Sequence, residues 1–298
     1  MILSMIGKFC NHPRLIMIKI ITDSTSDLPA ALVKQYNIGV VPLYLIWGDQ
    51  QYIDNVNITK EEFFARLPID PVAPTTSQPS MEDFAKAFRD AKVEGAEEII
   101  CVTVANDLSG TFQSATNAAR DAELKVHVVD SAATTMGLGF QALAAARALE
   151  AGGSVEDALN AIKPVRENLV TMVGLQTIEY VVRGGRLGGA MKWLGSTLSL
   201  KPIVTLDHAN GGKLVKLKMQ RTQRGLMNEV LKEFTKRLKS TQKVHVAVCH
   251  GGDLAVGKEL LAMVEEALHP VETVLTEYGP VLGVHAGPGG FALSGYSE

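Results

Sequence analysis

The chain has 298 residues, of which 46% are apolar and 20% are charged, so it is long and apolar enough for two globular domains. Its net charge of -3 excludes a general attraction to nucleic acid or to an anionic membrane surface, which needs a strongly basic face. The cysteines, Cys10, Cys101 and Cys249, are odd in number and lack metal-site spacing, which is typical of reduced thiols in a cytoplasmic protein.

Residues 1–16, MILSMIGKFCNHPRLI, do not match a signal peptide or a membrane span. Lys8, His12, Pro13 and Arg14 interrupt the apolar stretch, and no small-residue cleavage site follows. A fresh strand pattern begins at Met17. We therefore treat 1–16 as an N-terminal extension and expect no stable membrane insertion.

Short apolar runs alternate with helical patterns in the first half of the chain, which is the rhythm of a parallel sheet covered by helices. The predicted strands are MIKIIT (17–22), GVVPLYLIW (39–47), EEIICVTV (97–104) and KVHVVD (125–130). Capping pairs predict helix starts at Ser24 with Asp27, Thr59 with Glu62, Ser80 with Asp83, and Ser154 with Asp157. Residues 17–168 are thus expected to form an α/β domain with a doubly wound, mostly parallel sheet.

A second set of strands follows, and its connections indicate a mixed sheet. The predicted strands are LVTMVGL (169–175), KPIVTL (201–206), KLVKLKMQ (213–220), KVHVAVCH (243–250) and VETVLTEY (271–278). Asn210-Gly211-Gly212 is typical of a hairpin, and a helix over 254–268 would join two strands in a βαβ unit. Residues 169–298 are therefore expected to form a second α/β domain with helices on a mixed sheet.

Two glycine strings imitate a dinucleotide fingerprint without its context. Residues 137–142, GLGFQA, come seven residues after their strand, and residues 287–292, GPGGFA, lie too near the C-terminus for the required helix. The sequence has no P-loop string, no HExxH and no G-x-S-x-G. We therefore expect no cofactor and no metal.

Polar turns follow several of the predicted strands, where open α/β sheets gather ligands. They are DSTSD (23–27), PTTSQPS (74–80) and LSGT (108–111). Helix capping accounts for Ser24 and Ser80 but poorly for Thr75, Thr76 and Ser77, which precede the cap. The flanking prolines predict that PTTSQPS is a turn or an extended loop. Ser109 fits a helix cap and a ligand donor equally well.

Two further stretches allow either a purely structural or a functional interpretation. A lone histidine next to a strand, such as His285, is most often a satisfied core residue, but VHAGPGG (284–290) indicates backbone that turns sharply or approaches something closely. Between Arg183 and Lys243 lie 14 Lys and Arg against Asp207, Glu229 and Glu233. That stretch fits a solvated helix face as well as a docking surface for an acidic partner.

In this order, DSTSD, PTTSQPS, SGTFQSA, RGGR with the downstream LGSTLSLKPI, and VHAGPGG resemble the DegV family of bacterial fatty-acid-binding proteins, from Met17 almost to the C-terminus. The resemblance implies two α/β domains with a long-chain fatty acid, such as palmitate, buried at their junction. It implies that Thr76 and Ser109, within a hydroxyl cluster that includes Thr75 and Ser77, bind the carboxylate, with His285 close by.

The resemblance also implies a non-catalytic carrier that presents the acyl carboxylate to a partner fatty acid kinase for acyl-phosphate formation. Arg183, Arg186 and Arg221 are candidate contacts to that partner or to the ligand. Burying about 14 methylenes at about 0.8 kcal/mol each gives a gross gain of about 11 kcal/mol. Neutral hydroxyl donors would leave the carboxylate nucleophilic, whereas a bidentate arginine would hold both of its oxygens.

Two other classes of function stay open at this point. The chain is an acyl-ester hydrolase if Ser109 is a nucleophile, His285 its base, and Asp23 or Asp27 orients the imidazole. It is a protein-interaction module if the basic stretch 183–243 is its working surface. The fatty-acid carrier is the interpretation that we carry forward.

Overall fold

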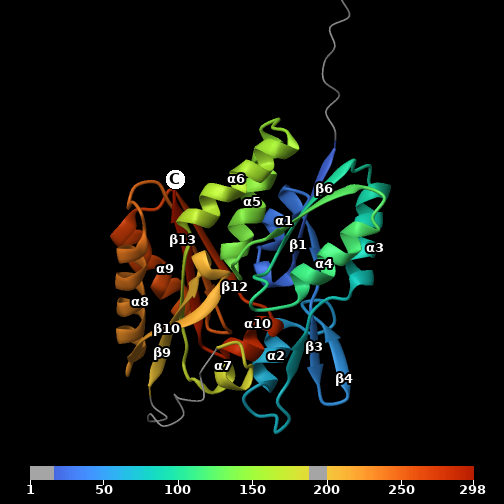
Figure 1. The fold of residues 1–298 in the computed structure, drawn as a ribbon. Coiled ribbons are helices and arrows are strands. Elements are labelled where there is room, and N and C mark those ends of the chain that lie inside the picture. Colours follow the sequence, from blue (N-terminus) through green and yellow to red (C-terminus); the bar gives the residue numbers. More distant parts are fainter. Residues whose placement is uncertain (1–16, 188–199) are drawn as a thin grey trace, which may run out of the picture.

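The computed structural model describes residues 17–187 and 200–298 (Figure 1). The extension 1–16 and most of the LGSTLSLKPI motif lie outside the described residues. The first half of the chain builds a four-stranded sheet in the order β2-β1-β6-β7, and each neighbouring pair is parallel. Its strands are β1 (Ile18–Asp23), β2 (Gly39–Val41), β6 (Glu98–Thr103) and β7 (Lys125–Asp130).

Helices cover both faces of this parallel sheet, as a doubly wound fold requires. They are α1 (Ala30–Gln35), α3 (Met81–Val93), α4 (Thr111–Arg120), α5 (Met136–Glu150) and α6 (Val155–Asn168). Successive strand residues face opposite sides, so Ile20 and Ile100 pack towards α5 while Ile21 and Ile99 pack towards α3 and α4. Burial on both faces explains the continuous apolar runs, and the predicted fold class is confirmed.

One predicted strand, 39–47, is wrong because the chain divides it at Pro42. Proline lacks the N–H that a central strand needs, so β2 stays in the parallel sheet while the next residues leave it. They enter a three-stranded antiparallel sheet in the order β4-β3-β5. This sheet and its neighbouring helix consist of β3 (Tyr44–Trp47), β4 (Gln50–Ile53), β5 (Thr75–Ser77) and α2 (Lys60–Arg66).

The segment PTTSQPS contains β5, so its prediction as a turn or loop is corrected to a short edge strand. Pro74 and Pro79 flank the three paired residues, which is where an edge strand tolerates proline. The capping boxes of α2, α3 and α6 are confirmed. The one predicted at Ser24 is wrong: Asp23 caps a single 3-10 turn, η1 (Ser24–Ser26), and Asp27 ends it at a φ of 50°.

The second half builds a mixed six-stranded sheet in the order β10-β9-β8-β13-β11-β12. The strands are β8 (Val170–Gly174), β9 (Lys201–Asp207), β10 (Lys213–Gln220), β11 (Val244–His250), β12 (Glu272–Glu277) and β13 (Phe291–Ser297). The helical segments are α7 (Glu179–Arg183), η3 (His208–Asn210), α8 (Gln223–Arg237), α9 (Leu254–Leu268) and α10 (Pro280–Ala286). The β9–β10 hairpin and the β11-α9-β12 unit confirm two predictions.

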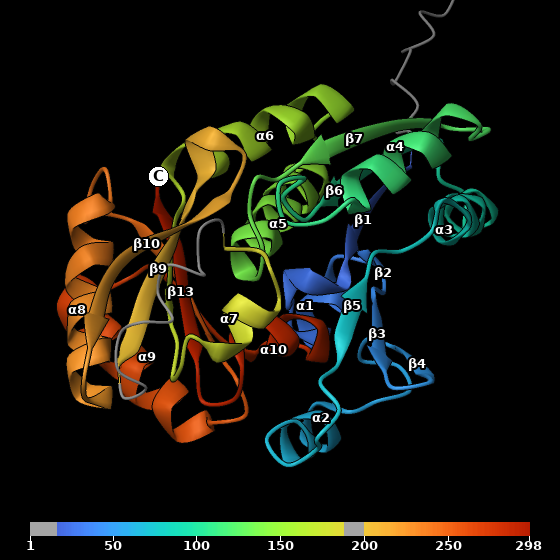
Figure 2. The same ribbon diagram turned by 60° about the horizontal axis from the view of Figure 1, so that its bottom comes forward.

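Helix α5 lies between the parallel sheet and the six-stranded sheet (Figure 2). Met136 and Phe140 of α5 belong to one core cluster with Cys249 of β11 and Ala292 of β13. The carboxyl ends of β1 and β6 therefore approach the six-stranded sheet next to this shared core. The division into domains near Asn168, where α6 ends, stays a proposal.

Candidate functional site

A cavity of about 280 Å³ lies where the parallel sheet, the small antiparallel sheet and the six-stranded sheet meet. We call it the junction pocket. Its polar lining side chains come mostly from the first half of the chain and are Thr25, Thr76, Ser77, Gln78, Ser109, Thr134 and Thr135, together with Arg186, Tyr278 and His285. Its apolar wall comes mainly from the second half and includes Val173, Leu175, Val204, Leu206, Leu214 and Ala292.

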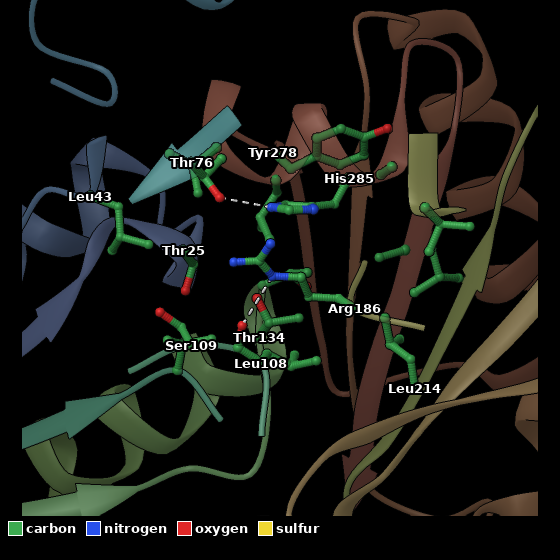
Figure 3. Close-up of a pocket in the computed structure, with 18 of the residues that line it drawn as sticks. Thr25, Leu43, Thr76, Leu108, Ser109, Thr134, Arg186, Leu214, Tyr278 and His285 are labelled. Atoms are coloured by element: carbon green, nitrogen blue, oxygen red, sulfur yellow. Dashed lines mark hydrogen bonds between the residues drawn. The ribbon is translucent and has the colours of Figure 1, made fainter. Parts of the chain in front are cut away.

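Three segments of the first half bring hydroxyls to one region of the pocket. Thr25 follows β1, Ser109 follows β6 and Thr76 lies on β5. In Figure 3 these side chains lie on one side of the guanidinium group of Arg186, and Leu214 lies on the other. The pocket therefore has a hydroxyl-rich end and an apolar end. Such a division suits a molecule with one polar head and one apolar tail.

His285 meets Thr76 at the hydroxyl-rich end, with 2.9 Å between His285 Nε2 and Thr76 Oγ1. Burial, and then the charge of Arg186, lower the pKa of His285 to about 4, so the imidazole is neutral at pH 7. Its Nδ1 is buried and has no hydrogen-bond partner in the described part of the chain. A neutral ring carries one proton, and its tautomer sets whether His285 Nε2 or Thr76 Oγ1 is the donor of this bond. With the proton on Nε2, the Thr76 hydroxyl hydrogen is free to point at a ligand.

The setting of His285 differs from the strand end that the sequence predicts. The residue lies in α10, a short helix that begins with Pro280 and ends at Gly287, whose φ is 75°. Gly184 packs against the imidazole so closely that a Cβ there would lie 2.1 Å from His285 Nδ1. Glycine in the RGGR motif therefore lets the backbone pass the ring.

Arg186 brings a positive charge to the same end of the pocket. Its Nη1 donates to the carbonyl oxygen of Gly184 at 2.7 Å and its Nε to that of Leu108 at 3.4 Å. None of its contacts with the described residues is an ion pair, and the residue is exposed. Arg186, a candidate ligand contact from the sequence, therefore lies beside the hydroxyls, and a guanidinium without an ion pair among the described residues favours an anionic ligand.

The remaining candidate residues are divided between the pocket and the surface. Ser77 lines the pocket, whereas Thr75 is exposed and lies outside the lining. Arg183 is exposed, pairs with Glu179 and stacks over Tyr180. Arg221 is exposed and lies outside the lining as well.

The arrangement does not contain the hydrogen bonds of a Ser-His-Asp triad. Ser109 Oγ lies 2.8 Å from Thr111 Oγ1, and His285 bonds to Thr76. Asp23 accepts from the backbone N–H groups of Thr25 and Val104, and Asp27 accepts from that of Gly279. Neither carboxylate orients the imidazole of His285, so the residues weighed for hydrolysis serve other contacts here.

Sequence reasoning missed Thr134 and Thr135, which line the pocket from the loop after β7. The signal was available, because SAATT (131–135) is another hydroxyl-rich turn directly after a predicted strand. Thr134 Oγ1 is buried with no hydrogen-bond partner among the residues described. Thr135 has a φ of 49°, an uncommon value for a β-branched residue. Such strain is found at ligand sites.

Two kinds of feature are absent from the described residues. In residues 17–187 and 200–298, no group of three or more His, Cys, Asp or Glu side chains is placed to hold a metal ion. Over the same ranges, no helix combines the length and apolar character needed to cross a membrane.

Known proteins are similar to this chain in both sequence and fold. A family model described as an uncharacterised protein of the DegV family matches residues 17–298. A DegV domain-containing protein of Streptomyces coelicolor is 34% identical over 277 residues, which cover 91% of this chain and 95% of the relative.

Two solved structures carry descriptions of a bound ligand. One is described as fatty acid binding of a DegV family protein from Thermus thermophilus; it is 35% identical with a TM-score of 0.87 and covers 95% of this chain and 100% of its own. The other is described as a stearic acid-binding protein from Eubacterium ventriosum; it is 27% identical with a TM-score of 0.86 and covers 94% of this chain and 98% of its own.

Proposed function

Since the chain belongs to the DegV family, we propose that it binds a long-chain fatty acid in the junction pocket. The carboxylate lies at the hydroxyl-rich end, near Thr76, Ser109 and Arg186, and the acyl chain lies along the apolar wall. The division of the pocket into these two ends is the observation that carries the proposal. Related structures described as fatty-acid-binding support it.

The head-group end meets what a carboxylate needs when it leaves water. Each of its oxygens loses hydration and requires donors. We infer that His285 Nε2–H donates to the threonine oxygen, which leaves the Thr76 hydroxyl to donate one hydrogen bond to the carboxylate. Ser109 offers a second hydroxyl, and the guanidinium of Arg186, which forms no ion pair with the described residues, supplies both N–H donors and opposite charge. Gross burial of the tail, about 0.8 kcal/mol per methylene, drives binding against the cost of ordering the chain.

The same proposal includes the role of a carrier. We infer that the protein presents the acyl carboxylate to a cytoplasmic fatty acid kinase, which forms the acyl phosphate, and performs no chemistry itself. Two observations support this: Ser109 and His285 do not bond to each other, and Arg186 is exposed at the head-group end. Arg183 and Arg221, also exposed and basic, are candidate contacts for that partner.

Lipid occupancy tests the proposal directly. Protein purified without added lipid is measured by native mass spectrometry, and palmitate affinity is then compared for the wild type and the Thr76→Ala/Ser109→Ala variant. Losing a hydrogen bond to a charged group costs about 1.5 to 3 kcal/mol, or about ten- to hundredfold in affinity. Thr75→Ala is the matched control, because Thr75 lies on the same strand but outside the pocket lining. Unchanged affinity in the double variant would refute the head-group assignment.

A further inference from the structure

Two buried aspartates of the first half hold the N-terminus of α10 in the second half. Asp27 Oδ1 accepts from the backbone N–H of Gly279 at 3.0 Å, and Asp54 Oδ1 accepts from that of Val281 at 3.1 Å. Asp27 is 6% exposed and Asp54 is 2% exposed. Two carboxylates thus satisfy N–H groups in the first turn of a helix that they approach from another part of the fold.

Helix α10 is a wall of the junction pocket. Its residues Val281, Leu282, His285 and Ala286 all line the cavity. Val281 and His285 are four positions apart and so lie on the same face of the helix, one turn from each other. The N–H that Asp54 holds therefore belongs to the residue directly below His285 on that face.

Burial of Asp27 and Asp54 disfavours the ionised form of both side chains. Burial raises the pKa of Asp27 well above its usual value, and Asp54 and Asp23 raise it further while Lys60 lowers it. Burial also raises the pKa of Asp54. Asp27 Oδ2 is buried with no hydrogen-bond partner among residues 17–187 and 200–298, and the Ser24 hydroxyl lowers the pKa of Asp54. Burying two carboxyl groups costs stability, and their bonds to the N–H groups of α10 offset part of that cost.

Other contacts fix α10 at its start, in its middle and at its end. Lys60 Nζ donates to the carbonyl oxygen of Glu277, just before the helix. Tyr278 Oη donates to the carbonyl oxygen of Gly287, just after it, at 2.6 Å. Phe63 packs so closely against Gly283 that a Cβ there would lie 2.3 Å from its ring. These contacts hold α10 in one position, and the two aspartates define where the helix starts.

We propose that Asp27 and Asp54 are positioning residues for the fatty-acid head group: they fix α10 in the register that sets His285 against Thr76. This inference rests on the proposed function, because the head group is what the Thr76–His285 contact would receive. It makes the affinity for a fatty acid depend on two carboxylates that are not in the pocket lining.

The test compares variants that remove the carboxyl oxygens of Asp27 and Asp54 with variants that keep an oxygen acceptor at both positions. Asp27→Ala/Asp54→Ala deletes both acceptors, whereas Asp27→Asn and Asp54→Asn keep an amide oxygen for the helix N–H. Asparagine also tolerates the φ of 50° at position 27. Asp253→Ala is the matched control, since Asp253 Oδ1 accepts from Val256 N–H at 3.1 Å at the start of α9, which contributes nothing to the pocket lining.

Two readouts separate this inference from the proposed function. The imidazole ¹⁵N resonances of His285 are recorded in protein stripped of lipid, and palmitate affinity is measured by titration. We expect the double alanine variant, or each single alanine variant if the double does not fold, to shift the His285 resonances and to bind palmitate about tenfold more weakly. The asparagine variants and Asp253→Ala should retain both signals.

Wild-type resonances and affinity in the alanine variants would overturn the inference, as would an equal loss of palmitate affinity in Asp253→Ala. If the wild type does not bind palmitate, the proposed function fails. The His285 resonances of the lipid-free variants still decide whether Asp27 and Asp54 position the imidazole ring.

Discussion

Thr76 of β5 and His285 of α10 stand 209 positions apart in the chain, and their side chains meet at 2.9 Å in the junction pocket. The contact joins an edge strand of the small sheet to a helix of the second half. A hydroxyl and a neutral imidazole together form a donor whose direction is set by the ring. Any displacement of either element therefore changes what the pocket offers a carboxylate.

Replacing His285 with glutamine should flatten the dependence of stability on pH. The pKa of His285 falls from 6.5 to about 4 on folding, so the unfolded chain binds more protons between these values and the wild type loses stability as the pH falls. The loss attributable to this residue is about 2 kcal/mol between pH 7 and pH 5. Urea unfolding of both proteins at the two pH values measures it.

Asp23 makes that comparison necessary. Burial raises its pKa to about 6, so its ionisation lowers stability as the pH rises through the same range. It affects both proteins alike, and the difference between them isolates His285. Parallel pH profiles for the wild type and the glutamine variant would show that His285 is not a buried neutral base.

Replacing Arg186 with glutamine should weaken palmitate binding about ten- to hundredfold, because the guanidinium lines the pocket and has no carboxylate partner among the described residues. Isothermal titration at two salt concentrations measures the affinity and its screening. Arg183→Gln is the control, since Arg183 is exposed and already paired with Glu179. Equal affinities for the Arg186 variant and the wild type would remove the arginine from the head-group site.

A tryptophan at Leu214 should shift the preference towards shorter acyl chains. Leu214 lines the pocket on the side away from Thr76, so added volume there shortens the space for the tail (Figure 3). Affinities for lauric and palmitic acid give the ratio. Val215→Trp, on the next residue of β10 and 41% exposed, is the control. A loss of both affinities in equal proportion would contradict the predicted orientation of the ligand.

Ser109 should stay unlabelled by a fluorophosphonate probe, and the protein should not hydrolyse acyl esters. The serine oxygen bonds to Thr111 Oγ1, and no imidazole of residues 17–187 and 200–298 forms a hydrogen bond with it. Labelling followed by mass spectrometry, with p-nitrophenyl palmitate turnover alongside, measures both. Stoichiometric labelling of Ser109 with turnover would restore the hydrolase interpretation.

Local sequence patterns predict most of the strands and helices here, because apolar runs and capping pairs report burial and helix starts directly. β13 escapes them: FALSGYS is buried throughout but has few large apolar residues, and Ser294 finds its partners only in the folded chain. Helix α10 escapes them too. Its sequence, PVLGVHA, has two valines and a central glycine and lacks a capping pair, and the acceptors of its first N–H groups, Asp27 and Asp54, lie far away in the chain.

Local sequence patterns also predict only part of the candidate site. Thr76, Ser109 and His285 are legible as candidates because hydroxyls and glycines at strand ends stand out, and all three lie in the junction pocket. The position of the Arg186 side chain cannot be predicted from the sequence, since the direction of a long side chain depends on the loop that carries it. Pro42 marks a break in the run 39–47, but the sequence does not show that β3 then joins a different sheet.

Helix α5 constrains how a ligand enters and leaves. Its residues Met136, Phe140 and Leu143 are buried in a core that both sheets share. Separating the two halves as rigid bodies would expose such side chains at a cost of about 1.5 to 3 kcal/mol each. If the chain binds a fatty acid as proposed, we expect the ligand to exchange through local displacement at the rim of the pocket while α5 stays in place. The rate of acyl exchange should follow the mobility of that rim and not the global stability of the fold.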